Sequence, residues 1–309
     1  MVIDMYYDII SLGEILIDFK VDENHSYNKS PGGAPVNVAC VMAKYNCKAT
    51  FIGKVGNDDL GTYLKDTLNK LNVDTSNILK DDEHITTQAF ITTDKNGERY
   101  FSFKRENTAD LFLNKQDIDP SLFKNCKIFH FGSLSLVNKT YETATSFALQ
   151  QALENKCIVS FDPNYREPLF KNKQLAIKKI RKYLPYIDIL KVSTEEAQMI
   201  TKTENTIDAI NALVKYHIPI ILVTDGEKGA MFKYKTYIGN ITPPKVKPVD
   251  TTGAGDIFLG AFLTMVCKYG KSIHTLSYDD LVTYTTKACT LASLSTEKNG
   301  AINSIPNFI

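Results

Sequence analysis

The residues with the clearest chemical meaning lie at 249–262, which read VDTTGAGDIFLGAF. Gly253-Ala254-Gly255 directly precede Asp256, and the apolar spacing that follows predicts a helix over 256–266. The first N–H groups of a helix lack internal partners and carry positive partial charge, so small residues there can wrap an anion such as phosphate. A carboxylate beside them can accept the proton of a hydroxyl that attacks phosphorus. The alternative is that Asp256 only caps the helix after a glycine turn.

Two common phosphate-binding motifs are excluded by their spacing. The dinucleotide fingerprint needs a third glycine or alanine three positions after Gly255, and Phe258 stands there. Neither GxxxxGKS nor GxxxxGKT occurs, since GNDDLGT at 56–62 lacks the lysine. The sequence therefore indicates neither a dinucleotide-dependent enzyme nor a P-loop protein.

The overall composition limits the classes of partner. The chain has 309 residues, 43% of them hydrophobic, with 36 basic and 35 acidic residues. The absence of a long basic block argues against a nucleic-acid partner. No apolar run approaches the roughly 20 residues of a membrane span, and the start of the chain has no basic region or cleavage site typical of a signal peptide. We expect a cytoplasmic protein with no nucleic-acid or membrane partner.

Six cysteines, at positions 40, 47, 126, 157, 267 and 289, form no CxxC pair and no zinc-type spacing. Most of them lie in apolar stretches such as VNVACVMA. We expect buried free thiols, in keeping with a reducing compartment.

Strand-like and helix-like patterns alternate along most of the chain. Strands predicted at 6–13 and 48–56 are followed by predicted helices at 34–46 and 58–72. Four more short, nearly all-apolar strands are predicted at 127–136, 157–164, 186–193 and 218–226. Continuous apolar strands separated by one-faced helices predict a doubly wound α/β core, whose parallel sheet is covered on both faces. Ligands of such a core bind beyond the carboxyl ends of the strands.

One region departs from this alternation. Residues 85–105 alternate with period two around Asn96-Gly97, which predicts a β-hairpin. A second β-type stretch at 16–27 precedes Pro31-Gly32-Gly33. These segments predict either an edge extension of the main sheet or a separate lid over the site, with Gly32-Gly33 as a hinge.

Two separated signatures resemble those of one enzyme family. SPGGAPVNVA (30–39) with FIGKVGNDDLG (51–61) resembles the N-terminal signature of the ribokinase-like, or PfkB-type, sugar kinases. VDTTGAGD (249–256) resembles their C-terminal signature. The segments between follow in the family's order, so the resemblance spans essentially the whole chain.

This resemblance implies a fold and a reaction. The implied fold is a Rossmann-like, doubly wound, mostly parallel core over 1–17, 32–84 and 111–309. Residues 18–31 and 85–110 are implied to be insertions that form a small β-sheet lid. The implied reaction is ATP-dependent, magnesium-requiring phosphorylation of a primary sugar hydroxyl.

The family's phosphoryl-transfer residues can be placed on this sequence one at a time. By this resemblance Gly253, Ala254 and Gly255 form the anion hole and Asp256 is the base. The remaining implied assignments are Thr224, Gly226 and Gly229 for the nucleotide, Glu196 for magnesium through water, and Asp250, Thr252 and Ser304 for a potassium ion.

The resemblance also implies a set of sugar-binding residues. Phe103 and Arg105 are expected on one face of a lid strand, since alternate residues of a strand share a face. The other implied sugar contacts are Asp18, Gly32, Gly33, Asn37, Asn164 and Arg166, together with Asp256.

Fructose is the expected substrate, because SFDPNYREPL and GERYFSFKR resemble fructokinases. The product would be fructose 6-phosphate. The alternative activities are those of ribokinase and of 2-keto-3-deoxygluconate kinase. The substrate of the latter bears a carboxylate, which Arg105 and Arg166 could hold. A remote alternative is a sugar- or nucleotide-binding protein without catalysis. A homodimer, formed through the lid, is also expected.

Overall fold

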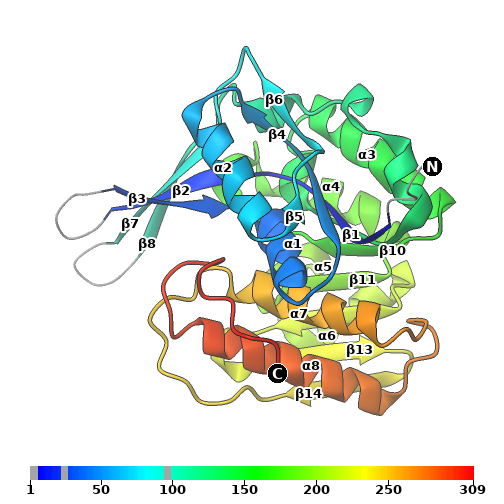
Figure 1. Ribbon diagram of the computed structural model, residues 1–309. Helices are drawn as coiled ribbons and strands as arrows, with labels where there is room; N and C mark the ends of the chain where they lie inside the picture. The colour runs from blue at the N-terminus through cyan, green and yellow to red at the C-terminus, as the bar shows by residue number, and fades with distance from the viewer. Residues whose placement is uncertain (1–5, 22–26, 94–98) are drawn as a thin grey trace.

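The main sheet is mostly parallel. A computed structural model of the protein describes residues 6–21, 27–93 and 99–309 (Figure 1). The strands follow the order β14-β13-β12-β11-β10-β9-β1-β4-β5, with β6 paired to β4, and β13 pairs antiparallel with both β12 and β14. Their bounds are β1 Tyr7–Leu12, β4 Ala49–Gly56, β5 Val73–Asp74, β6 Ile78–Asp81, β9 Cys126–Gly132, β10 Ile158–Asp162, β11 Ile189–Ser193, β12 Ile220–Thr224, β13 Ala230–Tyr234 and β14 Tyr237–Ile241.

Helices cover both faces of this sheet, which explains why its strands are apolar at consecutive positions (Figure 1). In β1, Ile9 enters the core under α1, α2, α7 and α8, whereas Ile10 enters the core under α3 to α6. The predicted doubly wound α/β class is confirmed. The helices are α1 Ala34–Lys44, α2 Asp59–Lys70, α3 Lys139–Glu154, α4 Lys173–Tyr183, α5 Thr194–Thr201, α6 Thr206–Leu213, α7 Ala254–Lys268 and α8 Tyr278–Ser295.

The strand order reverses at β1. This strand pairs with β4 on one side and with β9, which comes much later in the chain, on the other. Neighbouring parallel strands end at the same edge of the sheet, so the segments after β1, β10, β11 and β12 gather there. This is the switch point at which doubly wound folds bind ligands.

Four further strands form a separate small sheet in the order β3-β2-β7-β8. This small sheet, called the lid here, projects from the core in Figure 1. Its strands are β2 Leu16–Val21, β3 Tyr27–Gly32, β7 Gln88–Thr93 and β8 Arg99–Lys104. The antiparallel pairing of β7 with β8 confirms the predicted hairpin, although its Asn96-Gly97 turn lies outside the described residues. The second sheet is therefore separate rather than an extension of the main sheet.

Two local features differ from the sequence expectation. The hairpin of β13 and β14 was not predicted, because its turn carries no Asn-Gly or Gly pair and Lys235 adopts the positive φ of 51°. The strand predicted over 127–136 ends at Gly132, and 133–136 form a short 3-10 helix. Ser135 Oγ donates to Gly132 O, a local bond that competes with strand pairing.

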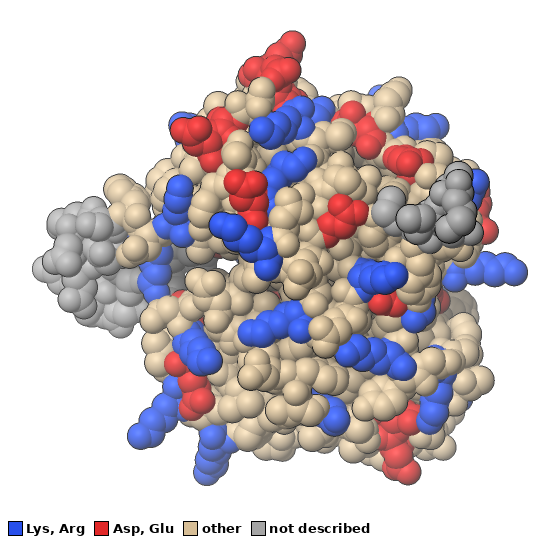
Figure 2. Space-filling view, viewed as in Figure 1, with Lys and Arg blue, Asp and Glu red and all other residues tan. Residues whose placement is uncertain are grey.

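The surface and the cysteines agree with the composition. Basic and acidic residues are interspersed on the face shown in Figure 2. All six cysteines are free thiols, and five of them are buried. In the described part of the chain, no helix is both long and apolar enough to span a membrane.

Candidate active site

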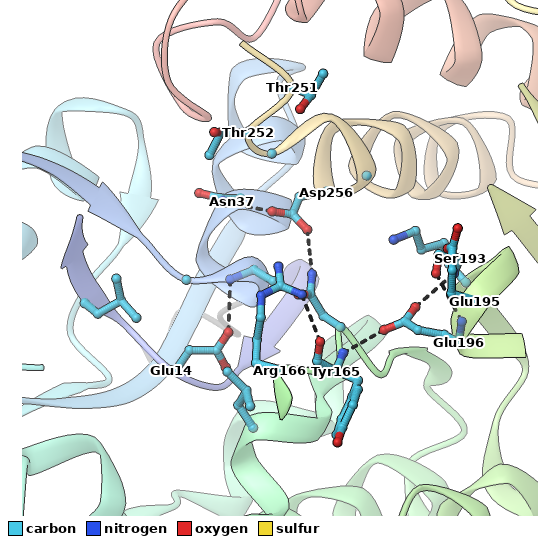
Figure 3. Close-up of a pocket in the computed structure, with 18 of the residues that line it drawn as sticks. Glu14, Asn37, Tyr165, Arg166, Ser193, Glu195, Glu196, Thr251, Thr252 and Asp256 are labelled. Carbon is cyan, nitrogen blue, oxygen red and sulfur yellow. Dashed lines mark hydrogen bonds between the residues drawn. The ribbon is translucent and has the colours of Figure 1, made fainter. Parts of the chain in front are cut away.

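A cavity of about 670 Å³ lies between the lid and the carboxyl edge of the main sheet. It joins residues from distant parts of the chain (Figure 3). The predicted site residues that line it are Asp18, Gly33, Asn37, Phe103, Asn164, Arg166, Glu196, Thr252, Gly253, Gly255 and Asp256. Ala254 lies between two of them, as the first residue of α7.

The start of α7 forms one wall of this cavity. Its N-cap is Gly253, with φ 77°, and no side chain caps the helix. A Cβ at Gly253 would lie 2.4 Å from Ala301 Cβ, so both the backbone and the packing require glycine there. The helix therefore begins at Ala254, and the N-cap alternative for Asp256 does not describe the structure.

Asp256 is held by side chains from two other elements. Asn37 Nδ2 of α1 donates to Asp256 Oδ2 at 2.7 Å, and Asn164 Nδ2 donates to Asp256 Oδ1 at 3.3 Å (Figure 3). The Asp256 residue is 6% exposed, yet it lines the cavity. The carboxylate is thus oriented by two amides while one side remains open to a ligand.

Burial raises the pKa of Asp256 to about 6, and the charge of Asp162 adds to this rise. The Asn37 bond and the positive charges of Lys191 and Arg166 oppose it. A carboxyl group with a pKa near 6 is mostly ionised at neutral pH and is still a better proton acceptor than an ordinary aspartate.

Two more acids, Asp18 and Glu14, line the cavity near the lid. Asp18 on β2 has its pKa raised to about 7, mainly by burial. A Cβ on Gly32 would lie 2.3 Å from Asp18 Oδ2, so glycine at 32 leaves room for this carboxylate. Gly33 has φ 118°, and a Cβ there would lie 2.3 Å from Glu14 O. Gly32 and Gly33 therefore shape the space around these acids.

Arg105 lies outside the cavity wall. β8 ends at Lys104, so the strand alternation does not extend to Arg105. The Arg105 guanidinium binds Asp110 Oδ2 through Nε at 2.9 Å and Nη2 at 2.6 Å, and it donates to Leu134 O at 3.1 Å. The residue is 6% exposed. Phe103 lines the cavity, whereas Arg105 does not line it and is held by Asp110 and Leu134.

Glu196 belongs both to the cavity and to a helix cap. Its Oε1 accepts from Tyr165 N at 2.6 Å, and its Oε2 accepts from Ser193 N at 2.9 Å (Figure 3). Ser193 Oγ accepts from Glu196 N in return, which completes a capping box at the start of α5. Two main-chain donors fix this carboxylate at the edge of the cavity.

The predicted nucleotide residues lie at the end of β12 and in the turn after it. Thr224 ends β12 and pairs in register with Ser193 of β11. Gly226 and Gly229 follow in a tight turn with φ 49° and 97°. These three residues share the carboxyl edge of the sheet with the cavity but do not line it.

The predicted potassium residues lie partly together. Asp250 Oδ1 accepts from Thr252 N at 2.9 Å and from Thr252 Oγ1 at 2.6 Å. Asp250 Oδ2 lies 3.5 Å from Lys20 Nζ of the lid. Ser304 Oγ donates to Ala301 O, and Ala301 packs against Gly253.

Among the cavity residues that the sequence reasoning missed, Glu14 and Lys191 are both buried and ionisable. Glu14 is 3% exposed and lines the cavity; its Oε1 accepts from Ala34 N at 3.1 Å, while its Oε2 has no hydrogen-bond partner among the described residues. Burial raises the pKa of Glu14 to about 7. Lys191 of β11 is 5% exposed and also lines the cavity. Lys191 lies inside an apolar strand, and Glu14 directly follows the predicted strand 6–13. An ionisable residue in or just after an apolar strand was the available signal.

Comparison with known proteins places the chain in a family. The pfkB family carbohydrate kinase model matches residues 5–307. "Probable fructokinase-5" of Arabidopsis thaliana is 37% identical over 306 residues, which cover 96% of this chain and 94% of that protein.

Two solved structures have nearly the same fold. The fructokinase with bound ATP from Xylella fastidiosa has a TM-score of 0.90 and 28% identity, with 96% of this chain and 94% of that chain covered. The fructokinase from Vibrio cholerae O395 in its fructose-, ADP- and calcium-bound form has a TM-score of 0.89 and 31% identity, with 98% and 96% covered. The chain therefore belongs to the pfkB family of carbohydrate kinases.

Proposed function

We propose that this protein is an ATP-dependent fructokinase that phosphorylates the C6 hydroxyl of fructose. The observation that carries the proposal is the carboxylate of Asp256, which is buried in the first turn of α7, held by Asn37 and Asn164, and open to the cavity. The names of the similar Arabidopsis, Xylella and Vibrio proteins support fructose as the acceptor and ATP as the donor.

In this reaction the sugar hydroxyl oxygen forms a bond to the γ-phosphorus. The bond from that phosphorus to the bridging oxygen breaks, and ADP leaves with the electron pair. Asp256 accepts the hydroxyl proton. The N–H groups of Gly253, Ala254 and Gly255 lie at the helix start, where they would stabilise the charge of the transferred group. The Ala254 N–H donates to Thr251 O at 3.3 Å and would exchange this long bond for the phosphoryl group.

The charges of the cavity favour a neutral sugar. Glu14 and Asp18 line the cavity, and in their ionised forms they would repel the carboxylate of an acid substrate. Arg105, one of the two arginines that an acid substrate would need, is bound to Asp110. Arg166 remains on the cavity wall, where it can serve the sugar or the phosphoryl group. These features favour fructose over 2-keto-3-deoxygluconate.

The residues present fit a magnesium ion held through water. Both oxygens of Glu196 already accept main-chain N–H groups, so this carboxylate suits contact through a water molecule better than direct ligation. Magnesium bound with ATP would neutralise charge on the β- and γ-phosphates.

A potassium ion near Asp250 and Thr252 is part of the proposal. The buried Asp250 carboxylate lies three residues before Gly253, so a cation there would add positive field to the anion site. Equal rates in K⁺ and in tetramethylammonium at the same ionic strength would reject the potassium site.

We also propose a homodimer formed through the lid and a cytoplasmic location. Phe19 stacks on Phe90 at 5.3 Å, and Tyr27, which is 61% exposed, contacts both rings. Such an aromatic cluster suits an interface. Light scattering should give twice the chain mass for the wild type and less for Tyr27→Lys, and a monomeric wild type would contradict the dimer. The six free thiols support the reducing cytoplasm.

A coupled ADP-release assay tests the proposed reaction. Fructose, ribose, mannose, adenosine and 2-keto-3-deoxygluconate are compared at equal concentration with ATP and Mg²⁺. We expect the highest kcat/KM with fructose and fructose 6-phosphate as its product. A higher kcat/KM for another substrate would reject fructokinase, and no transfer to any of them would favour the non-catalytic alternative.

A further inference from the structure

One buried charge in the cavity has no role in the reaction described above. Lys191 lies on β11 between the apolar residues Leu190 and Val192, and only 5% of it is exposed. Its Nζ donates to Asp162 Oδ2 at 2.9 Å. Among the described residues this is the only hydrogen bond of the ammonium, so N–H groups remain that can bind a ligand in the cavity.

The ammonium lies against the start of α7. A Cβ built on Gly255 would lie 2.8 Å from Lys191 Nζ, so glycine at 255 is what allows this approach. A cation next to a helix N-terminus is unfavourable on its own, because the helix end is also positive. The two positive groups become favourable together when an anion binds between them.

The surrounding carboxylates keep Lys191 charged. Asp162, Glu196 and Asp256 all raise the pKa of Lys191 and outweigh its burial. Pairing with Asp162 alone would satisfy a purely structural lysine. It would not require the ammonium to reach the cavity wall beside Gly255.

We propose that Lys191 is a catalytic residue whose ammonium donates hydrogen bonds to the phosphoryl group during its transfer. This inference rests on the proposed kinase function. Asp256 takes the proton of the sugar hydroxyl, ADP leaves with the electron pair, and Lys191 keeps all its protons. Its charge stabilises the negative charge that spreads over the phosphoryl oxygens in the transition state.

The test compares Lys191→Met with Lys54→Met in the fructose assay. Lys54 is a matched control, because it is a largely buried lysine of a strand that pairs with Asp81 and Asp117 but does not line the cavity. We expect Lys191→Met to lower kcat about 10²- to 10³-fold with the fructose KM within about threefold of wild type. The kcat of Lys54→Met should stay within about threefold, even if its melting temperature falls.

A binding measurement separates catalysis from structure. ADP with fructose and aluminium fluoride mimics the phosphoryl group in transfer, whereas ADP alone lacks it. Lys191→Met should weaken the aluminium fluoride complex at least about tenfold more than it weakens ADP. If this variant is insoluble, the same measurement is made on Lys191→Arg. The planar guanidinium of arginine cannot reproduce the geometry of the lysine ammonium.

Equal loss of affinity for both ligands, or an unchanged kcat, would overturn the role of Lys191. A wild-type protein that does not phosphorylate fructose would instead reject the proposed function. The two failures are therefore distinguishable in one set of assays.

Discussion

Asn37 Nδ2 lies 2.7 Å from Asp256 Oδ2, which joins the first turn of α1 to the first turn of α7. The two helices come from opposite ends of the chain and pack side by side (Figure 1). Gly33, where the lid strand β3 meets α1, lies four residues before Asn37. The hydrogen bond therefore links the base of the lid to the carboxylate that we propose as the catalytic base.

This relationship predicts a pH dependence. The pKa of Asp256 is raised to about 6, and a base acts only when ionised, so kcat/KM should fall as the pH decreases through about 6. The Asn37 bond stabilises the charged form, so Asn37→Leu should move this acid limb to higher pH. Asn164→Leu removes a longer bond and should move it less. An acid limb at the same pH in wild type and Asn37→Leu would contradict the assignment.

Asp18 should govern the affinity for the sugar. Its carboxylate lines the cavity beside Gly32, and a hydrogen bond to a charged group contributes about 1.5–3 kcal/mol. We expect Asp18→Asn to raise the fructose KM about 10- to 100-fold while the ATP KM stays nearly constant. Asp66→Asn, an exposed aspartate of α2, is the control. A fructose KM equal to that of the control would remove Asp18 from the sugar site.

Glu196 should set the magnesium requirement. In Glu196→Gln the side chain loses its charge and keeps one acceptor oxygen, so it can accept from only one of the N–H groups of Tyr165 and Ser193. We expect a higher magnesium concentration for half-maximal rate, together with a modest fall in melting temperature from the lost capping hydrogen bond. A magnesium titration identical to that of the wild type would reject the role of Glu196.

Arg105 should contribute to stability through Asp110. The two side chains are 4% and 0% exposed, so Arg105→Met leaves a buried carboxylate without its cation. The free energy of unfolding should fall by about 3–5 kcal/mol. Arg105→Met combined with Asp110→Asn should recover part of this loss in urea unfolding. A loss below about 1 kcal/mol in the single variant would show that the pair is not buried in solution.

Much of the fold could be predicted because local patterns carry it. Apolar strands such as 186–193 indicated a sheet covered on both faces, and the Asn96-Gly97 signal indicated the β7–β8 hairpin. The segment that contains the start of α7 could be located because an apolar helix follows the glycines, although the helix begins at Ala254, two residues before the predicted Asp256. The class of the fold and the anion-site segment were therefore readable from sequence.

The remaining features depend on contacts between distant residues. Alternation along β8 predicted that Arg105 faces the cavity, but the strand ends at Lys104 and Asp110 binds the guanidinium. Lys191 enters the cavity only because β11 ends beside α7 and residue 255 is glycine. Neither the ion pair nor the close approach leaves a local pattern in the sequence.

The central claim is that Asp256 accepts the proton of the sugar hydroxyl, and Asp256→Asn tests it most directly. An asparagine keeps the shape at the start of α7 but cannot act as the base. The measurement is kcat with fructose and ATP, with affinities for both ligands determined by calorimetry on the same protein. The account predicts that kcat falls by about 10² or more while both affinities stay within a few-fold of wild type. A kcat close to that of the wild type would contradict it.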